Sequence, residues 1–416
     1  MITTKKLECG TTMIMEPIPY LKSVALGIWV KAGSVDETPD VSGVSHYIEH
    51  MMFKGTENRT AKQIASDMDK IGGQFNAFTG KEATCYYIKT LSDNLDDAAD
   101  VLLDMLVNSR MDKKEMNKER KVILEEMKMI QDTPDEDVHD MISDLVFAGH
   151  PLGKSIIGTP ESLAGIDRDA LTGYLNREYT RDSIVIAIAG NYDEENVTEM
   201  FNKELSKLPA SKEPKSHDIG EYKKGFEVKV KDVEQSHICM AVPAVAYGDR
   251  DYYAMNLLNN IMGGSMSSRL FQNIREEKGL AYSVFSTYTP YSNGGYFTIY
   301  AGVSHDEIEG AIEGIKEELK ILKEDGITEE ELATAKAQMK SSYIFAQENV
   351  ATRMFSLGKN MTILGKIRTQ EEVIEGYDSV TMDDIHRMSE IICDMDKYCA
   401  AAITVDDFDL QGIVER

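Results

Sequence analysis

The sequence has little of what marks secreted and membrane-spanning proteins. Its 416 residues include only five cysteines, an odd and scattered set that argues against a disulfide framework and fits a reducing compartment. No apolar run approaches the roughly 20 residues that cross a bilayer. The first residues also lack the apolar core and cleavage site of a signal peptide. We therefore expect a cytoplasmic protein with no membrane partner.

Positive charge is also scarce. The chain has 45 lysines and arginines against 71 aspartates and glutamates, which gives a formal net charge of −26. A chain with this charge repels phosphate backbones, so we expect no nucleic-acid partner. The simplest interpretation of the acidic excess is solubility. The alternative is an acidic surface that favours basic peptides.

The length is too great for one compact core and suits two domains of about 200 residues. A stretch rich in proline, serine and lysine nearly halves the chain, and we place a linker there at residues 211–226, between domains 1–210 and 227–416. Each half has an apolar strand, a helix, a strand pair rich in glycine and aromatic residues, amphipathic helices, and a last helix and strand. We predict an α+β protein of two similar domains, each a mainly antiparallel sheet with helices packed on one face.

The stretch GVSHYIEHMMFKGT carries the first candidate site. On a helix, His46 and His50 lie one turn apart, roughly 6 Å from each other, so both imidazoles can face one metal ion. Glu49 projects near the same face and can act as a general base toward a metal-bound water. The spacing leaves open an ordinary, partly buried helix with two hydrogen-bonded histidines.

A catalytic zinc site takes three protein ligands and keeps one open position. The candidates for the third ligand lie in NKERKVILEEMKM, where Glu119 and Glu126 are seven residues apart and share one side of a helix. By spacing alone, these glutamates are as well explained as solvated acids on a charged helix.

Together these residues resemble a known family. The H-x-x-E-H pattern, followed 76 residues after His50 by Glu126, is similar to the inverted zinc motif of the pitrilysin group of metallopeptidases, the inverzincins. The length resembles the processing-peptidase branch and its bacterial relatives. The resemblance implies a zinc metalloendopeptidase with zinc held by His46, His50 and Glu126. Glu49 would be the base, and Glu119 would orient a ligand.

Two further stretches are similar to substrate-binding elements of this family. In GGQFNAFTGKEATCYY, Asn76 and Ala77 would offer backbone groups to an extended peptide that joins the sheet as an added strand. In SSRLFQNIREEKGLAYSV, Tyr282 would stabilise the oxyanion and Arg275 would hold substrate oxygens. Without the resemblance, an arginine on a solvated helix face and a tyrosine in a strand are the simpler interpretation.

The resemblance implies an endopeptidase that hydrolyses unfolded or short peptides inside a closed chamber. The second half has no H-x-x-E-H, so we expect one zinc per chain. We also expect a homodimer in which Arg275 and Tyr282 act on the partner's zinc. One alternative is a non-catalytic, peptidase-like binding or assembly subunit. Another is a different zinc hydrolase or a structural metal site, which would usually take four protein ligands, often cysteines.

Overall fold

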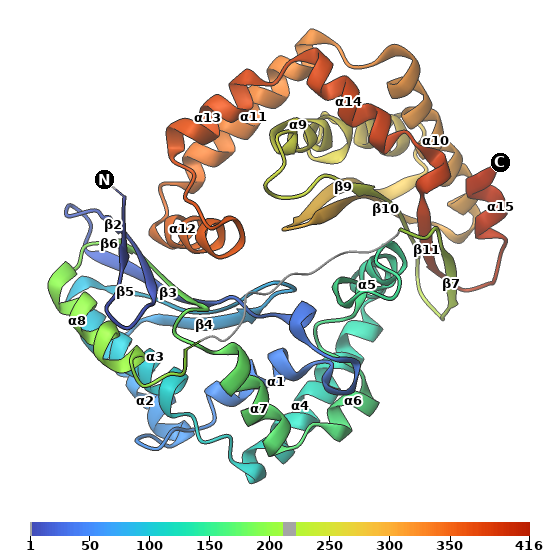
Figure 1. Ribbon diagram of the computed structural model, residues 1–416. Helices are drawn as coiled ribbons and strands as arrows, with labels where there is room; N and C mark the ends of the chain where they lie inside the picture. Colours follow the sequence, from blue (N-terminus) through green and yellow to red (C-terminus); the bar gives the residue numbers. More distant parts are fainter. Residues whose placement is uncertain (1, 211–221) are drawn as a thin grey trace. The chain divides into compact units, whose positions relative to one another are not determined.

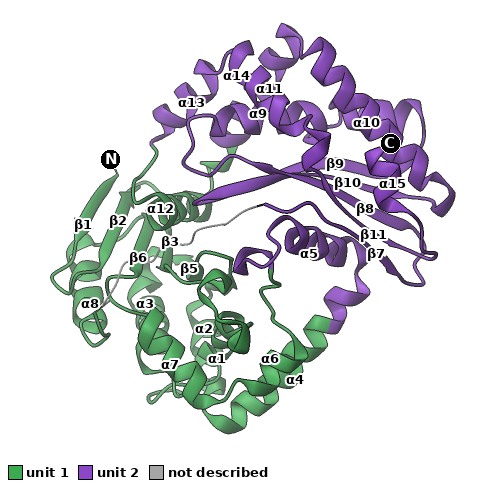
Figure 2. Cartoon of the chain, turned by 45° about the vertical axis from the view of Figure 1, so that its right-hand side comes forward, with its two compact units in different colours: residues 1–127, 154–216, 345–368 green, residues 128–153, 217–344, 369–416 purple. Residues whose placement is uncertain are grey.

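The computed structural model describes residues 2–210 and 222–416, so positions 211–221 of the expected linker lie outside the described residues (Figure 1). The chain forms two compact units that interleave along the sequence (Figure 2). The first unit takes its residues from 1–127, 154–216 and 345–368, and the second from 128–153, 217–344 and 369–416. The boundaries 1–210 and 227–416 remain a prediction from the sequence.

The first unit contains a six-stranded sheet in the order β1-β2-β6-β3-β5-β4. Its strands are β1 (Thr3–Lys6), β2 (Thr12–Pro17), β3 (Ser23–Val30), β4 (Gln74–Thr79), β5 (Thr84–Leu91) and β6 (Ile184–Gly190). Only the β2–β6 pair is parallel. The apolar sequence IVIAIAG of β6 is buried at every position, which is typical of a strand that is covered on both faces of its sheet.

The helices of the first unit connect these strands. They are α1 (Val44–Met52), α2 (Ala61–Ile71), α3 (Leu95–Asn108), the main part of α4 (Lys113–Asp132), α6 (Pro160–Gly165), α7 (Arg168–Glu178), α8 (Glu194–Leu205) and α12 (Val350–Leu364). α1 contacts β4 and α3 contacts β5, so the helix with the two histidines lies beside the outer strand of the sheet.

The second unit repeats this plan with a five-stranded sheet in the order β7-β11-β8-β10-β9. Its strands are β7 (Phe226–Val230), β8 (Ser236–Ala244), β9 (Ala281–Tyr291), β10 (Gly294–Val303) and β11 (Cys399–Thr404). Its helices are α5 (Pro134–Val146), α9 (Tyr252–Gly263), α10 (Ile308–Asp325), α11 (Glu329–Ala346), α13 (Gln370–Ser379), α14 (Met382–Ile392) and α15 (Leu410–Glu415). The strand order matches β2-β6-β3-β5-β4, so two similar α+β domains with mainly antiparallel sheets are confirmed.

Each sheet also carries one helix on its other face, which the sequence did not predict. In the first unit α12 packs across β3 and β6, where Trp29, Met354 and Leu357 belong to one buried apolar cluster. In the second unit α5 packs against β8 and β11. Both helices follow a longer helix along the chain and are exchanged between the halves of the sequence (Figure 2).

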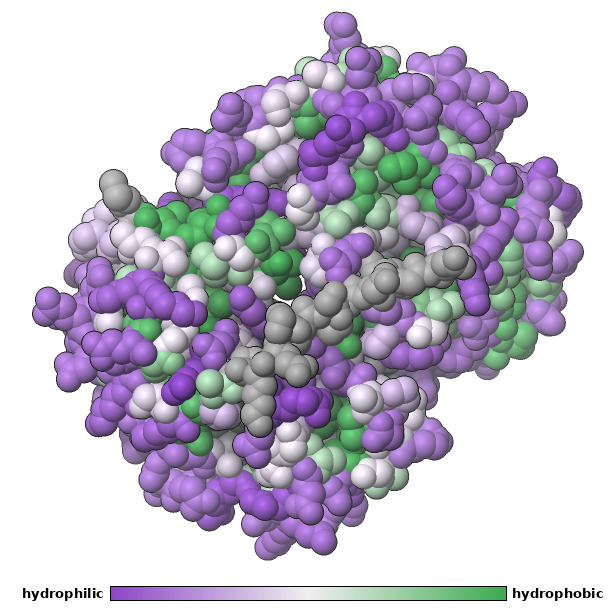
Figure 3. Space-filling view, in the orientation of Figure 1, coloured by the Kyte–Doolittle hydropathy of each residue, from purple (hydrophilic) through white to green (hydrophobic). Residues whose placement is uncertain are grey.

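Hydrophilic residues cover most of the molecular face that Figure 3 shows, as the composition leads one to expect. None of the helices within residues 2–210 and 222–416 combines the length and the apolar character that a bilayer crossing requires.

Glycine allows α12 to approach its sheet closely. A Cβ atom at Gly358 would lie 1.9 Å from the indole nitrogen of Trp29, and one at Gly27 would lie 2.3 Å from the sulfur of Met354. Trp29 is 3% exposed, so its ring has no room to move away. The contact therefore requires glycine for reasons of space, although glycine weakens a helix interior.

We predict that Gly358→Ala destabilises the fold by about 1–3 kcal/mol, the usual cost of adding volume to a packed core. Gly173 in α7 is the matched control, because it is an exposed helical glycine with nothing within 4 Å of a built Cβ. Gly173→Ala should instead stabilise the protein by about 0.5–1 kcal/mol. Urea unfolding curves of both variants measure the two effects, and equal stabilisation by both would contradict the packing described for α12.

Candidate metal centre

Helices α1 and α4 bring three possible metal ligands together. His46 and His50 stand one turn apart on α1, with their ring centroids 4.7 Å from each other. Glu126 reaches them from α4: its carboxylate oxygens lie 3.4 Å from His50 Nε2 and 3.8 Å from His46 Nε2. One ligand atom from each of the three residues lies within 4.8 Å of the other two.

The residues fit a zinc ion. Two donors at 2.0–2.1 Å from a tetrahedral ion are about 3.4 Å apart, close to the separation of His50 and Glu126. The 3.8 Å between His46 Nε2 and Glu126 is too long for a hydrogen bond. Burial lowers the pKa of His46 to about 4, so this imidazole is neutral near pH 7. Neutral imidazole is the form that binds metal ions.

Glu119 holds His50 from the side away from Glu126. This carboxylate is buried, lies 3.2 Å from His50 Nδ1 and 2.8 Å from Lys54 Nζ. A carboxylate on the second ring nitrogen of a histidine fixes the tautomer and orientation of the ring. Sequence reasoning selected Glu119 but missed Lys54, whose place four residues after His50 was the available signal.

Glu49 is held by the neighbouring outer strand. Thr79 Oγ1, at the end of β4, donates a hydrogen bond of 2.5 Å to Glu49 Oε2. Burial raises the pKa of Glu49, and the bond from Thr79 opposes that rise. A carboxylate with a raised pKa is better suited to accept a proton near neutral pH. Sequence reasoning missed Thr79, although it follows the selected Asn76 and Ala77 in the same strand.

Strand β4, which contacts α1, is the last strand of its sheet in the part of the chain that the structure describes, so one edge is open. Gly80 N–H donates to Ala83 O at the hairpin turn, and Ala77 is paired with Tyr86. Hydrogen-bonded and non-hydrogen-bonded pairs alternate along an antiparallel ladder. Since the Gly80–Ala83 pair is hydrogen-bonded, the Ala77–Tyr86 pair falls at a non-hydrogen-bonded position. The backbone N–H and C=O of Ala77 therefore point away from β5, toward the open edge. In the structure the Asn76 Oδ1 accepts the Ala77 N–H at 2.9 Å.

Arg275 and Tyr282 lie in the second unit and contact each other there. The guanidinium carbon of Arg275 is 5.6 Å from the centre of the Tyr282 ring and 4.8 Å from that of Phe271. Tyr282 is 73% exposed. Arg275 belongs to a π-helical segment, Phe271–Glu277, a rare conformation that is frequent at functional sites. The action of this pair on the metal centre remains a prediction.

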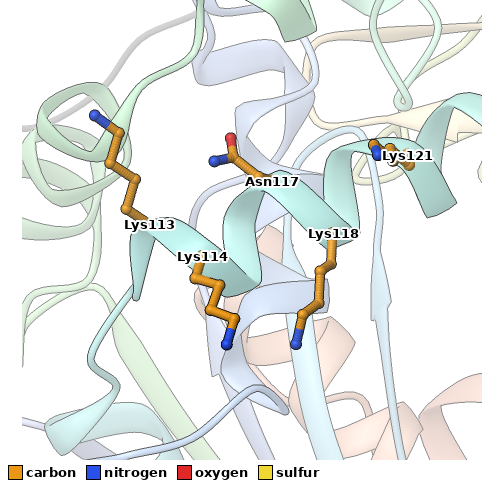
Figure 4. Close-up of a pocket in the computed structure, with 5 residues that line it drawn as sticks. All are labelled: Lys113, Lys114, Asn117, Lys118 and Lys121. Carbon is orange, nitrogen blue, oxygen red and sulfur yellow. The ribbon is translucent and has the colours of Figure 1, made fainter.

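A separate pocket lies on another face of α4 (Figure 4). The residues that line it are Lys113, Lys114, Asn117, Lys118 and Lys121. At about 100° per residue, these side chains centre on the side of the helix roughly opposite Glu119 and Glu126. Helix α4 thus presents acids to the metal centre and lysines away from it.

We predict that Glu119→Gln weakens zinc binding about 10–100-fold, the usual effect of removing the carboxylate that orients a ligand histidine. Glu115→Gln on the same helix is the control, because Glu115 pairs with Lys118 instead. Competition titration with a chelating zinc indicator measures both affinities. Unchanged binding in Glu119→Gln would contradict the role given to this residue.

Comparison with known protein families agrees with this geometry. Residues 12–160 match the family model described as "Insulinase (Peptidase family M16)". Residues 165–339 match that described as "Peptidase M16 inactive domain". The metal centre falls within the first match. The second match begins after it, in the part of the chain that has no H-x-x-E-H.

Relatives and solved structures extend the match over almost the whole chain. An "Uncharacterized zinc protease YmxG" of Bacillus subtilis is 41% identical over 391 residues, covering 92% of this chain and 94% of the relative. An uncharacterized zinc protease of Rickettsia bellii is 39% identical, covering 91% and 92%.

Two crystal structures share the fold. One is a peptidase M16 inactive domain from Pseudomonas fluorescens (TM-score 0.90, 19% identity, 98% of both chains). The other is a protease from Helicobacter pylori (TM-score 0.90, 21% identity, 97% of this chain and 99% of that one). At this level of identity these structures support the fold alone, while the relatives above support the family. The chain therefore belongs to peptidase family M16, the pitrilysin family of zinc peptidases.

Proposed function

We propose that this protein is a zinc-dependent endopeptidase that cleaves unfolded or short peptides. The observation that carries this proposal is the position of Glu49. This carboxylate lies on the same helix as two imidazoles that meet Glu126, and it is hydrogen-bonded to the last residue of an open-edged strand. A base, a set of metal donors and a place for a peptide backbone thus occur side by side.

His46, His50 and Glu126 would hold the zinc ion, which supplies Lewis acidity toward a peptide carbonyl and toward water. Glu49 takes a proton from the attacking water and passes it to the leaving amine. The Thr79 hydroxyl keeps one oxygen of Glu49 fixed, so the other oxygen remains available for that proton. Glu119 and Lys54 keep the His50 ring in one orientation.

The open edge of β4 supports an extended, unfolded substrate. A peptide that adds to this edge is bound through its backbone, which tolerates many side chains. The Ala77 N–H and C=O face that edge, and the incoming strand would displace the Asn76 side chain from the Ala77 N–H. A folded protein seldom offers a free strand, so this mode of binding favours unfolded or short peptides.

The family resemblance supports the remainder of the proposal, a closed chamber formed by a homodimer. In it, Arg275 and Tyr282 of each chain act at the partner's metal centre. Tyr282 is exposed and Arg275 contacts its ring, so a substrate could reach both side chains. There Tyr282 would donate a hydrogen bond to the developing oxyanion, and Arg275 would hold substrate oxygens.

We predict that Glu49→Gln abolishes cleavage of unfolded peptides, with a loss of at least about 100-fold because the proton acceptor is gone, while one zinc per chain is retained. Cleavage of a peptide panel and metal analysis of the same samples give both results. Glu57→Gln, an exposed glutamate nearby, serves as the control and should leave both unchanged. A wild-type protein that binds zinc but cleaves none of the peptides would instead favour a non-catalytic binding or assembly subunit.

The proposed homodimer leads to a second prediction. Glu49→Gln and Tyr282→Phe subunits should each be inactive as homodimers but recover up to about a quarter of the wild-type activity when they are mixed and allowed to exchange, because half of the chains then form heterodimers with one intact site. Size-exclusion chromatography with light scattering monitors the oligomeric state. No recovery in mixtures shown to contain heterodimers would rule out action in trans.

A further inference from the structure

Glu37 is a buried carboxylate at the start of the helix that carries both histidines. It is 8% exposed and lies seven residues before the first residue of α1. Its Oε2 accepts the Gly43 N–H at 2.7 Å, and its Oε1 accepts the Ser45 N–H at 2.8 Å. These are backbone donors at the N-terminus of α1, which have no partner inside the helix. Glu37 therefore caps α1 from outside the helix.

Among residues 2–210 and 222–416, no other side chain accepts a hydrogen bond from the backbone at this helix end. The N-cap residue of α1 is Gly43, which offers no side-chain acceptor and has a φ of 91°. Its position is tightly enclosed, since a Cβ there would lie 2.6 Å from the Ile157 carbonyl oxygen. The two oxygens of Glu37 thus supply the acceptors that serine, threonine or aspartate would normally supply at an N-cap.

The segment that carries Glu37 is attached to the hairpin between β4 and β5. Ser34 N–H donates to Gly80 O at 3.2 Å, and Val35 N–H donates to Lys81 O at 2.9 Å. The start of α1 is therefore tied, through Glu37, to the turn that follows the outer strand. The Thr79–Glu49 hydrogen bond ties β4 to the middle of α1, so the helix is held to β4 and its hairpin turn at two points.

Burial of the Glu37 carboxyl group disfavours its charged form and raises its pKa to about 7, although the hydrogen bonds from Ser45 and Gly43 act to lower that pKa. A buried carboxyl group whose two oxygens bond backbone donors at a helix end, beside a candidate metal centre, is a candidate for a functional role. His46 follows Ser45 directly, in the first turn of α1, whereas His50 lies one turn further on. Loosening of the first turn would therefore displace His46 first.

We propose that Glu37 is a positioning residue that fixes the first turn of α1, and with it His46, relative to the β4–β5 hairpin. This inference rests on the proposed zinc site and deepens it. Glu37 acts through the backbone N–H groups of Gly43 and Ser45 and does not touch the metal or the substrate.

The chemistry of the cap makes Glu37→Gln a sharp test. Glutamine has the same shape, but it offers one acceptor oxygen, and its NH2 group would face a backbone N–H donor. We expect Glu37→Gln to bind zinc at least ten-fold more weakly than the wild type. At saturating zinc, kcat should fall at least five-fold while KM stays within two-fold. Zinc affinity is measured with a competing indicator, so the test does not depend on cleavage alone.

The matched control is Asp193→Ala. Asp193 caps α8 in the same unit by accepting the Asn196 N–H at 3.1 Å, and α8 carries none of the metal ligands. The control should lower the thermal midpoint without weakening zinc binding. The inference is overturned if Glu37→Gln binds zinc as tightly as the wild type, or if both variants lose affinity in proportion to their loss of thermal stability. A wild-type protein that takes up no zinc would overturn the proposed function itself.

A measurement on the wild-type protein covers the case in which Glu37→Gln does not fold. Hydrogen–deuterium exchange should show the amides of Gly43 and Ser45 protected for minutes or longer in peptides spanning residues 42–47, because Glu37 bonds both. Exchange of these amides within seconds would overturn the proposed role of Glu37.

Discussion

The candidate metal centre depends on the packing of two helices that are distant in the sequence. α1 fixes the separation of its two imidazoles by its own geometry, but a third donor has to come from α4, and its position depends on how the two helices pack. The Glu119 carboxylate lies in this interface, between His50 and Lys54, and is buried there. A buried carboxylate is stable only when it is paired, so Glu119, His50 and Lys54 stabilise one another. The same contacts that join the helices therefore also orient His50, one of the proposed zinc ligands.

The outer strand β4 adds a second constraint, because it has to stay beside α1 while its edge remains free. Thr79 is hydrogen-bonded to Glu49 of α1, and the hairpin turn is hydrogen-bonded to the segment that carries Glu37. The Ala77 backbone groups, in contrast, face away from β5. Open edges invite unwanted pairing with other chains. The Asn76 side chain accepts the Ala77 N–H and so leaves one fewer free donor on this edge.

Much of the fold and of the candidate metal centre could be predicted from the sequence. The spacing of His46 and His50 was sufficient to place both on one helix face, and the parallel order of elements in the two halves was sufficient to predict two similar sheets. Spacing left the role of Glu126 open, because seven residues along a helix place two acids on one side without saying what that side contacts. The family resemblance selected Glu126, and the structure places its carboxylate beside both imidazoles.

Other features could not be predicted, because they depend on contacts across the fold. Periodicity shows that α5 and α12 have apolar faces, but not which sheet each one covers, so their exchange between the halves was missed. Thr79, Lys54 and Glu37 are ordinary residues in the sequence and acquire roles only through partners brought close by folding.

The measurement that tests the central claim most directly is X-ray absorption spectroscopy of the zinc-loaded protein. The account predicts a first shell of nitrogen and oxygen at about 2.0–2.1 Å with the outer scattering of two imidazoles. A sulfur shell near 2.3 Å, or the scattering of fewer than two imidazoles, would contradict it.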